Sequence, residues 1–306
     1  MERRDLVCLG RPKLYSRGYM RIVSLLIFIA SFAVPQLGAL DLQTETFESI
    51  ATANHLDKEA YLSLFDRPSF RFQDPHEFAV VSIPKSGTYL VAKLLSLMTG
   101  QLPKWRVYNY KYVFTRCHFW NEETIKELGS KKNVRLIIPC RDPRDIAVSA
   151  ACFFSGCPSR ADGTNGPAPV PVLDAVWQTS TFDEKLSLMI GHPRTYLKSS
   201  FEQLFAFAQR ADVYLCRFEN LVGPNGEGSL EKQKAEIICL AEFVNVRLTP
   251  AQINYLCANI YGNTYSFREG KIGAWKNSFT EEHKALFKRV MGESLVQLGY
   301  ESNNDW

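Results

Sequence analysis

Short apolar runs alternate with longer mixed segments along most of this 306-residue chain. The runs at 78–83, 134–139 and 213–218 are rich in β-branched and aromatic residues, which is typical of strands buried on both faces of a parallel sheet. The alternation predicts an α/β fold, a single domain with a central parallel sheet flanked by helices and with ligand at the carboxyl ends of the strands. The segments between and after these runs predict helices at 57–65, 88–99, 143–153, 195–209, 230–244, 250–258 and 281–298.

Composition divides the chain into three parts. Residues 1–40 hold a basic tail and a hydrophobic segment, residues 41–75 form a polar-to-amphipathic lead-in, and residues 76–306 carry the strand and helix pattern. Near the end of the chain, Thr249 and Thr280 have the polar oxygen and the following residues expected of helix N-caps.

The first strand runs directly into a turn of the kind that holds phosphate. Pro84 ends the apolar run, Lys85 and Gly87 form the turn, and Thr88 opens a helix. Free N–H groups and the positive end of the helix dipole meet there, and the lysine adds a full charge. The turn therefore predicts a P-loop-like nucleotide-binding architecture, although the usual nucleoside-triphosphate loop has its lysine after the glycine, not before it.

The second strand also leads into a helix start. Asp142 suits the N-cap, Pro143 suits the first helical position, and Asp145 lies in the first turn. Arg141 can grip a phosphate through two parallel hydrogen bonds, and the Ser149 hydroxyl can add a third. The structural alternative is that Arg141 pairs with Asp142 or Asp145 and that Ser149 is an ordinary helix residue.

These segments, with a third one downstream, resemble the sulfotransferase family. That family has P-K-[ST]-G-T in its 5′-phosphosulfate loop, as at 84–88, and R-[ND]-P-x-D-x-x-x-S in its 3′-phosphate motif, as at 141–149. A later loop, R-K-G-x-x-G-D-W-K-N-x-F-T, is matched in part at 268–280. The resemblance covers nearly everything after about residue 75 and implies that 76–306 is a sulfotransferase domain.

The resemblance also implies a donor and roles for particular residues. The donor is 3′-phosphoadenosine 5′-phosphosulfate (PAPS), and the sulfuryl group passes in line to an acceptor hydroxyl or amine with no metal ion required. Lys85 is expected to stabilise the leaving phosphate, and His118, placed at the end of a further strand, is expected to deprotonate the acceptor. The 5′-phosphate is expected on Thr88 and on the amides of Ser86, Gly87 and Tyr89, and the 3′-phosphate on Arg141, Ser149, Arg268 and the Gly270 amide.

Some positions depart from the family pattern. Glu269 replaces the usual lysine beside Arg268, and Lys271 is the residue expected to compensate for its negative charge. Leu90 and Phe218 stand where the family often has a tryptophan and a tyrosine. The adenine contact is therefore left open among Trp105, Trp120 and Phe267.

Charge and hydropathy set the expected location. The net charge is +4, but the first 21 residues account for all of it, so the rest of the chain is balanced and predicts no nucleic-acid surface. An uninterrupted apolar run at 22–34 follows this basic start. It predicts either a single-pass N-terminal membrane anchor or a cleaved signal that leads to export, with a buried helix as a third reading.

Several questions stay open at the level of sequence. The acceptor can be a small molecule, lipid, glycan or protein, and a homodimer is one alternative for the assembly. The cysteines indicate mainly buried thiols, with a Cys152–Cys157 disulfide as the alternative. The irregular stretch at 155–171 predicts either an acceptor lid or a surface loop. The competing functions are a small-molecule P-loop kinase and a membrane-tethered nucleotide binder without catalysis.

Overall fold

The computed structural model describes residues 47–65, 77–100, 104–105, 114–118, 134–156, 174–193, 195–264 and 267–306. At 104–105 and 114–118 it describes the backbone only. The predictions for the basic tail, for the hydrophobic segment at 22–40, for Trp120, for Cys157 and for most of the 155–171 stretch lie outside these residues. Within the described ranges, no helix combines the length and the apolar character that spanning a bilayer takes.

A parallel five-stranded sheet forms the centre of the molecule, in the order β2-β3-β1-β4-β5. The predicted α/β fold is therefore confirmed, and three of the strands lie where the hydrophobic pattern placed them, to within one residue. The strands are β1 (Glu77–Ser82), β2 (Lys104–Trp105), β3 (Phe114–His118), β4 (Val134–Cys140) and β5 (Val213–Arg217).

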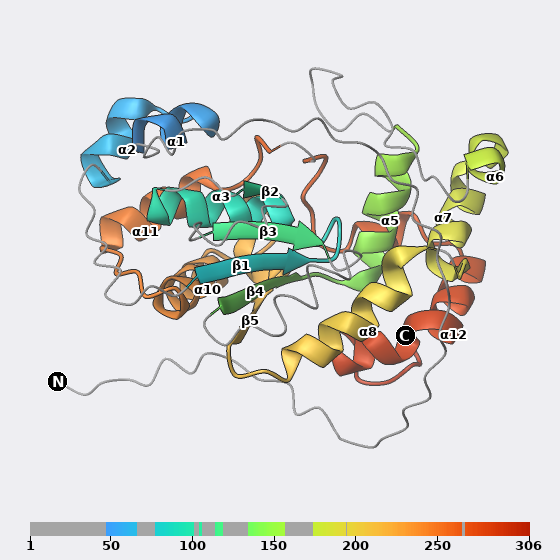
Figure 1. The fold of residues 1–306 in the computed structure, drawn as a ribbon. Coiled ribbons are helices and arrows are strands. Elements are labelled where there is room, and N and C mark those ends of the chain that lie inside the picture. Colours follow the sequence, from blue (N-terminus) through green and yellow to red (C-terminus); the bar gives the residue numbers. More distant parts are fainter. Residues whose placement is uncertain are drawn as a thin grey trace, which may run out of the picture.

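Helices cover both faces of this sheet (Figure 1). One layer contains α1 (Phe47–Ala53), α2 (Lys58–Phe65), α3 (Thr88–Thr99), α10 (Leu230–Phe243) and α11 (Pro250–Asn259). The other contains α5 (Pro143–Phe154), α7 (Phe182–Gly191), α8 (Tyr196–Ala208) and α12 (Glu281–Gln297). The shorter elements are α6 (Asp174–Thr179), α9 (Phe218–Leu221), η1 (Pro224–Gly226) and η2 (Ala274–Asn277).

The alternation of side chains along β1 explains why both layers are needed. Phe78 and Val80 enter one hydrophobic core, whereas Ala79 and Val81 enter the other. All of these side chains are at most 2% exposed. A strand whose residues are apolar at every position has to be covered on both faces, because successive side chains point to opposite sides.

The predicted helix caps are present. Asp142 accepts a hydrogen bond from the Arg144 amide at the start of α5. Thr249 and Gln252 form a capping box at α11, and Thr280 does the same with His283 at α12. These caps satisfy backbone N–H groups that the first turn of a helix leaves without a partner.

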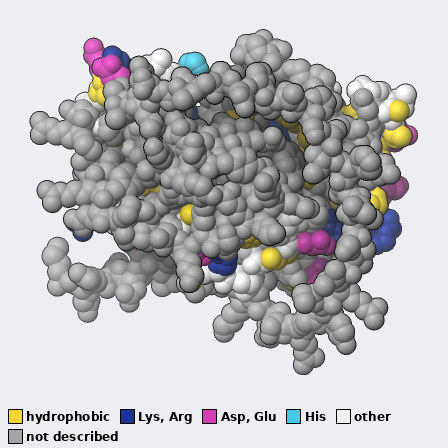
Figure 2. Space-filling model, viewed as in Figure 1, with side chains coloured by type: hydrophobic (Ala, Val, Ile, Leu, Met, Phe, Trp, Pro, Cys, Tyr) yellow, Lys and Arg dark blue, Asp and Glu magenta, His cyan; other side chains and the backbone are white. Residues whose placement is uncertain are grey.

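Surface charge is mixed where side chains are described. In Figure 2, acidic and basic side chains lie next to one another at the margins of the face shown. Lys58 and Glu48, for example, form an ion pair of 3.0 Å between α1 and α2. Below the surface, the Cys152 side chain is buried, and its proposed disulfide partner Cys157 lies outside the described residues, so the disulfide alternative stays a prediction.

Candidate functional site

A cavity of about 340 Å³ lies at the carboxyl ends of β1 and β4. Three segments far apart in the sequence form most of its walls: the turn before α3, the β4–α5 corner with α5 as far as its last residue, and residues 264–274. The residues predicted from sequence that line it are Lys85, Gly87, Thr88, Tyr89, Arg141, Ser149, Arg268 and Gly270. The structure thus brings the three predicted segments to one place.

The turn between β1 and α3 owes its shape to unusual backbone angles. Lys85 has φ of +73° and Gly87 has φ of +108°, a conformation that glycine adopts at little cost. A Cβ atom on Gly87 would lie 2.9 Å from Cδ2 of Phe218. The hydroxyl groups of Ser82 and Thr88 are 2.7 Å apart and join the strand to the first helical turn. The turn therefore directs the amides at the start of α3 toward the cavity.

Ser86 occupies the buried side of this turn. Its backbone N–H donates to the Ile83 carbonyl at 3.1 Å, and its side chain is 0% exposed. Its hydroxyl has no hydrogen-bond partner among the residues that the structure describes. Ser86 does not line the cavity, and its amide, a predicted contact of the 5′-phosphate, already donates within the turn.

Lys85 places its ammonium group over an aromatic ring of α5. The Nζ atom lies 4.2 Å from the centroid of the Phe153 ring, within the range of a cation–π contact. Burial lowers the pKa of Lys85 to about 7, and the positive charges of Arg141 and Arg268 contribute to the shift. Sequence reasoning did not identify Phe153 as a partner of this lysine, although it lies one helical turn after Ser149.

Arg141 is held by backbone carbonyls and by a ring. Its guanidinium donates to the carbonyl of Lys85 at 3.3 Å and to that of Lys271 at 2.9 Å, and it lies 4.2 Å from the Phe218 ring centroid. The Nε atom is buried without a hydrogen-bond partner among the described residues. Neither carbonyl carries a full charge, so the guanidinium remains available to an anion.

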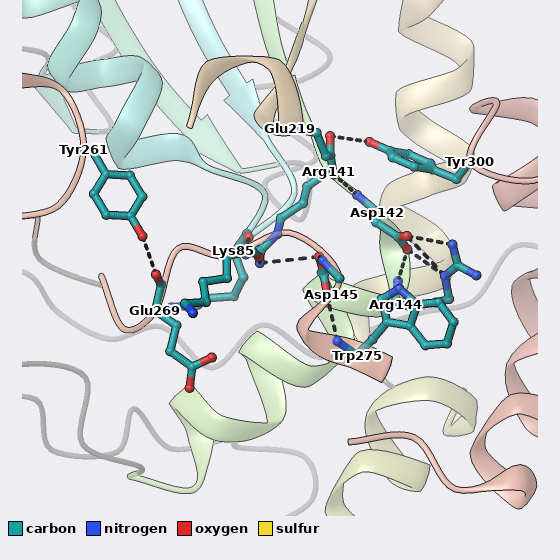
Figure 3. A network of polar contacts seen from close by, with 12 residues as sticks. Lys85, Arg141, Asp142, Arg144, Asp145, Glu219, Tyr261, Glu269, Trp275 and Tyr300 are labelled. Carbon is teal, nitrogen blue, oxygen red and sulfur yellow. Dashed lines mark hydrogen bonds and ion pairs between the residues drawn. The ribbon is translucent and has the colours of Figure 1, made fainter. Parts of the chain in front are cut away.

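The structural alternative for Arg141 holds only in part. Asp145 approaches its guanidinium to 3.7 Å, but Asp142 pairs with Arg144 instead, at 2.7 Å. Figure 3 shows the contact of Arg141 with Asp145; both residues line the cavity, whereas Arg144 does not. Arg141 therefore has a looser ion pair than Arg144.

Asp145 has a structural role that the sequence did not reveal. Its two carboxylate oxygens accept the backbone N–H groups of Gly273 and Trp275, at 2.8 and 3.0 Å (Figure 3). Burial raises the pKa of Asp145, while the nearby Arg141 opposes that shift. This carboxylate ties the loop at 267–273 to α5. The sequence signal that could have revealed this role is the position of Asp145 inside the 141–149 motif.

The loop charges differ from the expected arrangement. The Glu269 carboxylate forms an ion pair with Arg268, and the Lys271 ammonium pairs with Glu227 at 2.8 Å. Arg268, not Lys271, thus compensates Glu269 in the structure. An anion that uses Arg268 has to compete with Glu269 for it.

Gly270 and two aromatic rings shape the same wall. Gly270 has φ of +64°, and a Cβ atom there would lie 2.6 Å from Cε2 of Phe267. The Tyr261 hydroxyl donates to the Glu269 carbonyl at 2.6 Å and fixes the loop from outside (Figure 3). Of the three residues left open for adenine, Phe267 lines the cavity, while the side chain of Trp105 and all of Trp120 lie outside the description.

His118 is placed by its backbone. It is the last residue of β3 and lies in register with Ser82, the last residue of β1, so it ends at the same edge of the sheet as the Lys85 turn. Its side chain is outside the description. No group of metal-ligating side chains is found among the described residues.

Comparisons with known proteins agree with this geometry. A family model described as sulfotransferase domain matches residues 75–299. The crystal structure of the mouse sulfotransferase SULT7A1, solved in complex with PAP, resembles this chain with a TM-score of 0.52 and 16% sequence identity. That likeness covers 80% of this chain and 91% of the mouse chain, and it shows a shared fold. A search of curated proteins found no match.

Proposed function

Because this chain belongs to the sulfotransferase family, we propose that it transfers a sulfuryl group from PAPS to an acceptor hydroxyl or amine. The observation that carries the proposal is that Lys85, from the β1–α3 turn, and Arg141 and Arg268, from two other segments, line one cavity. Two separate cationic cradles suit a nucleotide with phosphate at both its 5′ and 3′ positions.

The residues present fit such a donor. The Arg141 Nε is a buried polar atom without a partner among the described residues, and Arg141 belongs to the predicted 3′-phosphate contacts. A Cβ atom on Gly87 or Gly270 would clash with Phe218 or Phe267, whose side chains line the same cavity. PAP, the bisphosphate bound in the mouse sulfotransferase, carries the same 3′- and 5′-phosphates and is the natural probe for this cavity.

We assign the following roles to the chain's own groups. Lys85 and the N-terminus of α3 stabilise negative charge on the leaving phosphate while its S–O bond to the sulfuryl group breaks. His118 accepts the proton of the acceptor as the new S–O bond (to a hydroxyl) or S–N bond (to an amine) forms. We infer that no metal ion is required, because lysine and helix dipole already supply positive charge where it develops.

Calorimetry with the full chain tests the nucleotide assignment. We expect PAP to bind more tightly than ATP with magnesium, and we expect Arg141→Ala to abolish that advantage. Equal binding of the two nucleotides by the unmodified protein would reject the donor site, and tighter ATP binding would favour the P-loop kinase.

Turnover with labelled donor tests catalysis. A panel of phenols, sterols, glycans, lipids and tyrosine peptides serves to find the acceptor. Lys85→Ala and His118→Ala are each expected to lower turnover at least about 100-fold. If PAP binds but no acceptor on the panel turns over, the alternative of a binder without catalysis gains, and the Arg268–Glu269 pair is the feature that supports it.

The remaining predictions concern the location of the protein and the molecules with which it interacts. We propose that the segment at 22–40 anchors the chain in a membrane or directs its export. We also propose that the acceptor substrate is the molecule with which the protein interacts, and that it binds in the cavity. A homodimer stays an open alternative, and we propose no nucleic-acid partner because the charge after residue 21 is balanced.

A further inference from the structure

Residues 300–306 follow α12 and contact the β4–α5 corner through Glu301 and Trp306. We call them the tail segment. No member of this segment lines the cavity, yet the segment contacts both of the motifs that face the 3′ side of the proposed donor. Any effect it has on a ligand must therefore pass through other residues.

One connection runs through Tyr300. Its hydroxyl donates to Oε2 of Glu219 at 3.0 Å, and Oε1 of Glu219 accepts the backbone N–H of Asp142 at 2.8 Å (Figure 3). The Asp142 amide belongs to the peptide group that follows Arg141. The tail segment thus helps to set the backbone that carries the Arg141 guanidinium.

A second connection runs through Glu301 and Arg144. Glu301 pairs with Arg144 at 2.6 Å, and Arg144 pairs in turn with the Asp142 carboxylate at 2.7 Å. The Arg144 side chain is 4% exposed, so this chain of charges is largely protected from solvent. Removing one partner of a buried ion pair leaves the other charge uncompensated and destabilises the folded protein. We therefore expect these pairs to stay formed and to hold the tail segment in place.

The third contact is aromatic. The Arg144 guanidinium lies 4.0 Å from the Trp275 ring centroid and 4.5 Å from that of Trp306, so it contacts both indoles. The two indole rings also meet edge to face, with centroids 5.6 Å apart. Trp275 follows the 267–273 loop and donates its amide to Asp145. Trp306 therefore contacts Arg144 at the β4–α5 corner and Trp275 in η2, which follows the 267–273 loop.

We propose that the tail segment is a positioning element that holds Arg141 and the 267–273 loop in the geometry that binds a 3′-phosphate. This inference rests on the proposed function, because it takes the Arg141 side of the cavity as the 3′-phosphate cradle. It predicts that the tail segment controls selectivity for a 3′-phosphorylated nucleotide, while the 5′-phosphate cradle at the β1–α3 turn is independent of it.

The test compares two nucleotides on full-length variants. PAP and AMP share adenine, ribose and 5′-phosphate, and only PAP carries the 3′-phosphate. Trp306→Ala is expected to weaken PAP binding about tenfold and to leave AMP binding unchanged, measured by calorimetry with competition against PAP for the weaker ligand. Trp306→Phe keeps an aromatic ring and is expected to restore most of the PAP affinity.

Further variants separate positioning from general stability. Glu301→Gln has nearly the same shape as the original side chain and is expected to give the same selective loss, so it decides the outcome if Trp306→Ala does not fold. Lys288→Gln is the control, because Lys288 also lies over the Trp306 ring, at 5.2 Å, but is not part of the network that reaches Asp142. It should leave both affinities unchanged.

The outcomes are distinct. Equal losses of PAP and AMP binding, or no loss for Glu301→Gln and Trp306→Ala, would overturn the positioning role. If the unmodified protein does not prefer PAP over AMP, the proposed donor site itself fails, whatever the variants do.

Discussion

The β1–α3 turn and the β4–α5 corner line one cavity but are built in different ways. The turn depends on backbone conformation: Lys85 and Gly87 adopt positive φ, and a Cβ atom on Gly87 would meet Phe218. The corner depends on side chains: Asp142, Asp145 and Glu219 each accept more than one hydrogen bond there.

The difference indicates how each side responds to substitution. The shape of the turn depends on a few backbone dihedral angles. A single residue that cannot adopt its angle should therefore cause most of the ligand affinity to be lost. A corner held by several carboxylates should lose stability in steps, because each carboxylate has its own partners. Substitutions on the two sides should therefore give different combinations of affinity and stability changes.

The largest expected effect is on the turn. Gly87→Ala places a methyl group at φ of +108° and 2.9 Å from Phe218, so we expect PAP and AMP affinity both to fall about 100-fold or more. Calorimetry measures both ligands, and retention of either affinity would contradict a turn governed by its backbone.

Gly299→Ala is the matched control for this substitution. Gly299 also has positive φ, at +72°, but the nearest atom to an added Cβ lies 3.9 Å away and the residue does not line the cavity. It should cost about 1–2 kcal/mol of stability from the backbone angle alone and leave nucleotide affinity unchanged.

The next effect is on the stability of the corner. Asp145→Asn turns an amide NH₂ toward one of the two N–H groups that the carboxylate accepts, and it removes the charge beside Arg141. We expect the free energy of unfolding to fall by about 2 kcal/mol in urea titrations. Asp183→Asn, at an exposed position in the first turn of α7, should change it by less than about 0.5 kcal/mol. Similar values for the two variants would show that Asp145 does not brace the loop.

The smallest effect is a pH dependence specific to the turn. In the free protein the pKa of Lys85 is lowered to about 7, and a bound anion would keep this lysine protonated to higher pH. Binding then takes up a proton above pH 7, so PAP affinity should fall as the pH rises, by about tenfold between pH 6 and 8. Lys85→Arg, which stays charged throughout this range, should lack that component. Calorimetry in buffers of different ionisation enthalpy measures the proton uptake, and identical profiles for the two proteins would refute the assignment.

Local signals explain the parts of the fold that the sequence predicted well. The strands β1, β4 and β5 and the helices that begin after Asp142, Thr249 and Thr280 have apolar patterns or caps within a few residues. The helix α7 was not predicted although Thr181 and Glu184 form a capping box that the sequence displays. The helices α1 and α6 are only 7 and 6 residues long, too short for a helical period to show.

The candidate site was predictable only where motifs carry it. The cavity gathers Lys85, Arg141 and Arg268 because each belongs to a motif at the end of a strand or in a loop. The contact of Glu301 with Arg144 joins residues 157 positions apart, and that of Tyr300 with Glu219 joins residues 81 apart. Such contacts depend on how α12 packs against the sheet, and no local pattern in the sequence encodes them.

The adjacency of β1 and β4 in the sheet has a consequence for ligand size. Neighbouring strands lie about 4.8 Å apart, a spacing fixed by their backbone hydrogen bonds. The two proposed phosphate cradles begin at the ends of these strands. The strand spacing is therefore expected to limit how far apart two bound anionic groups can lie. Changes in the loops around the cavity can alter which acceptors bind. The size of the nucleotide that fits should change less, because it depends on the fixed distance between β1 and β4.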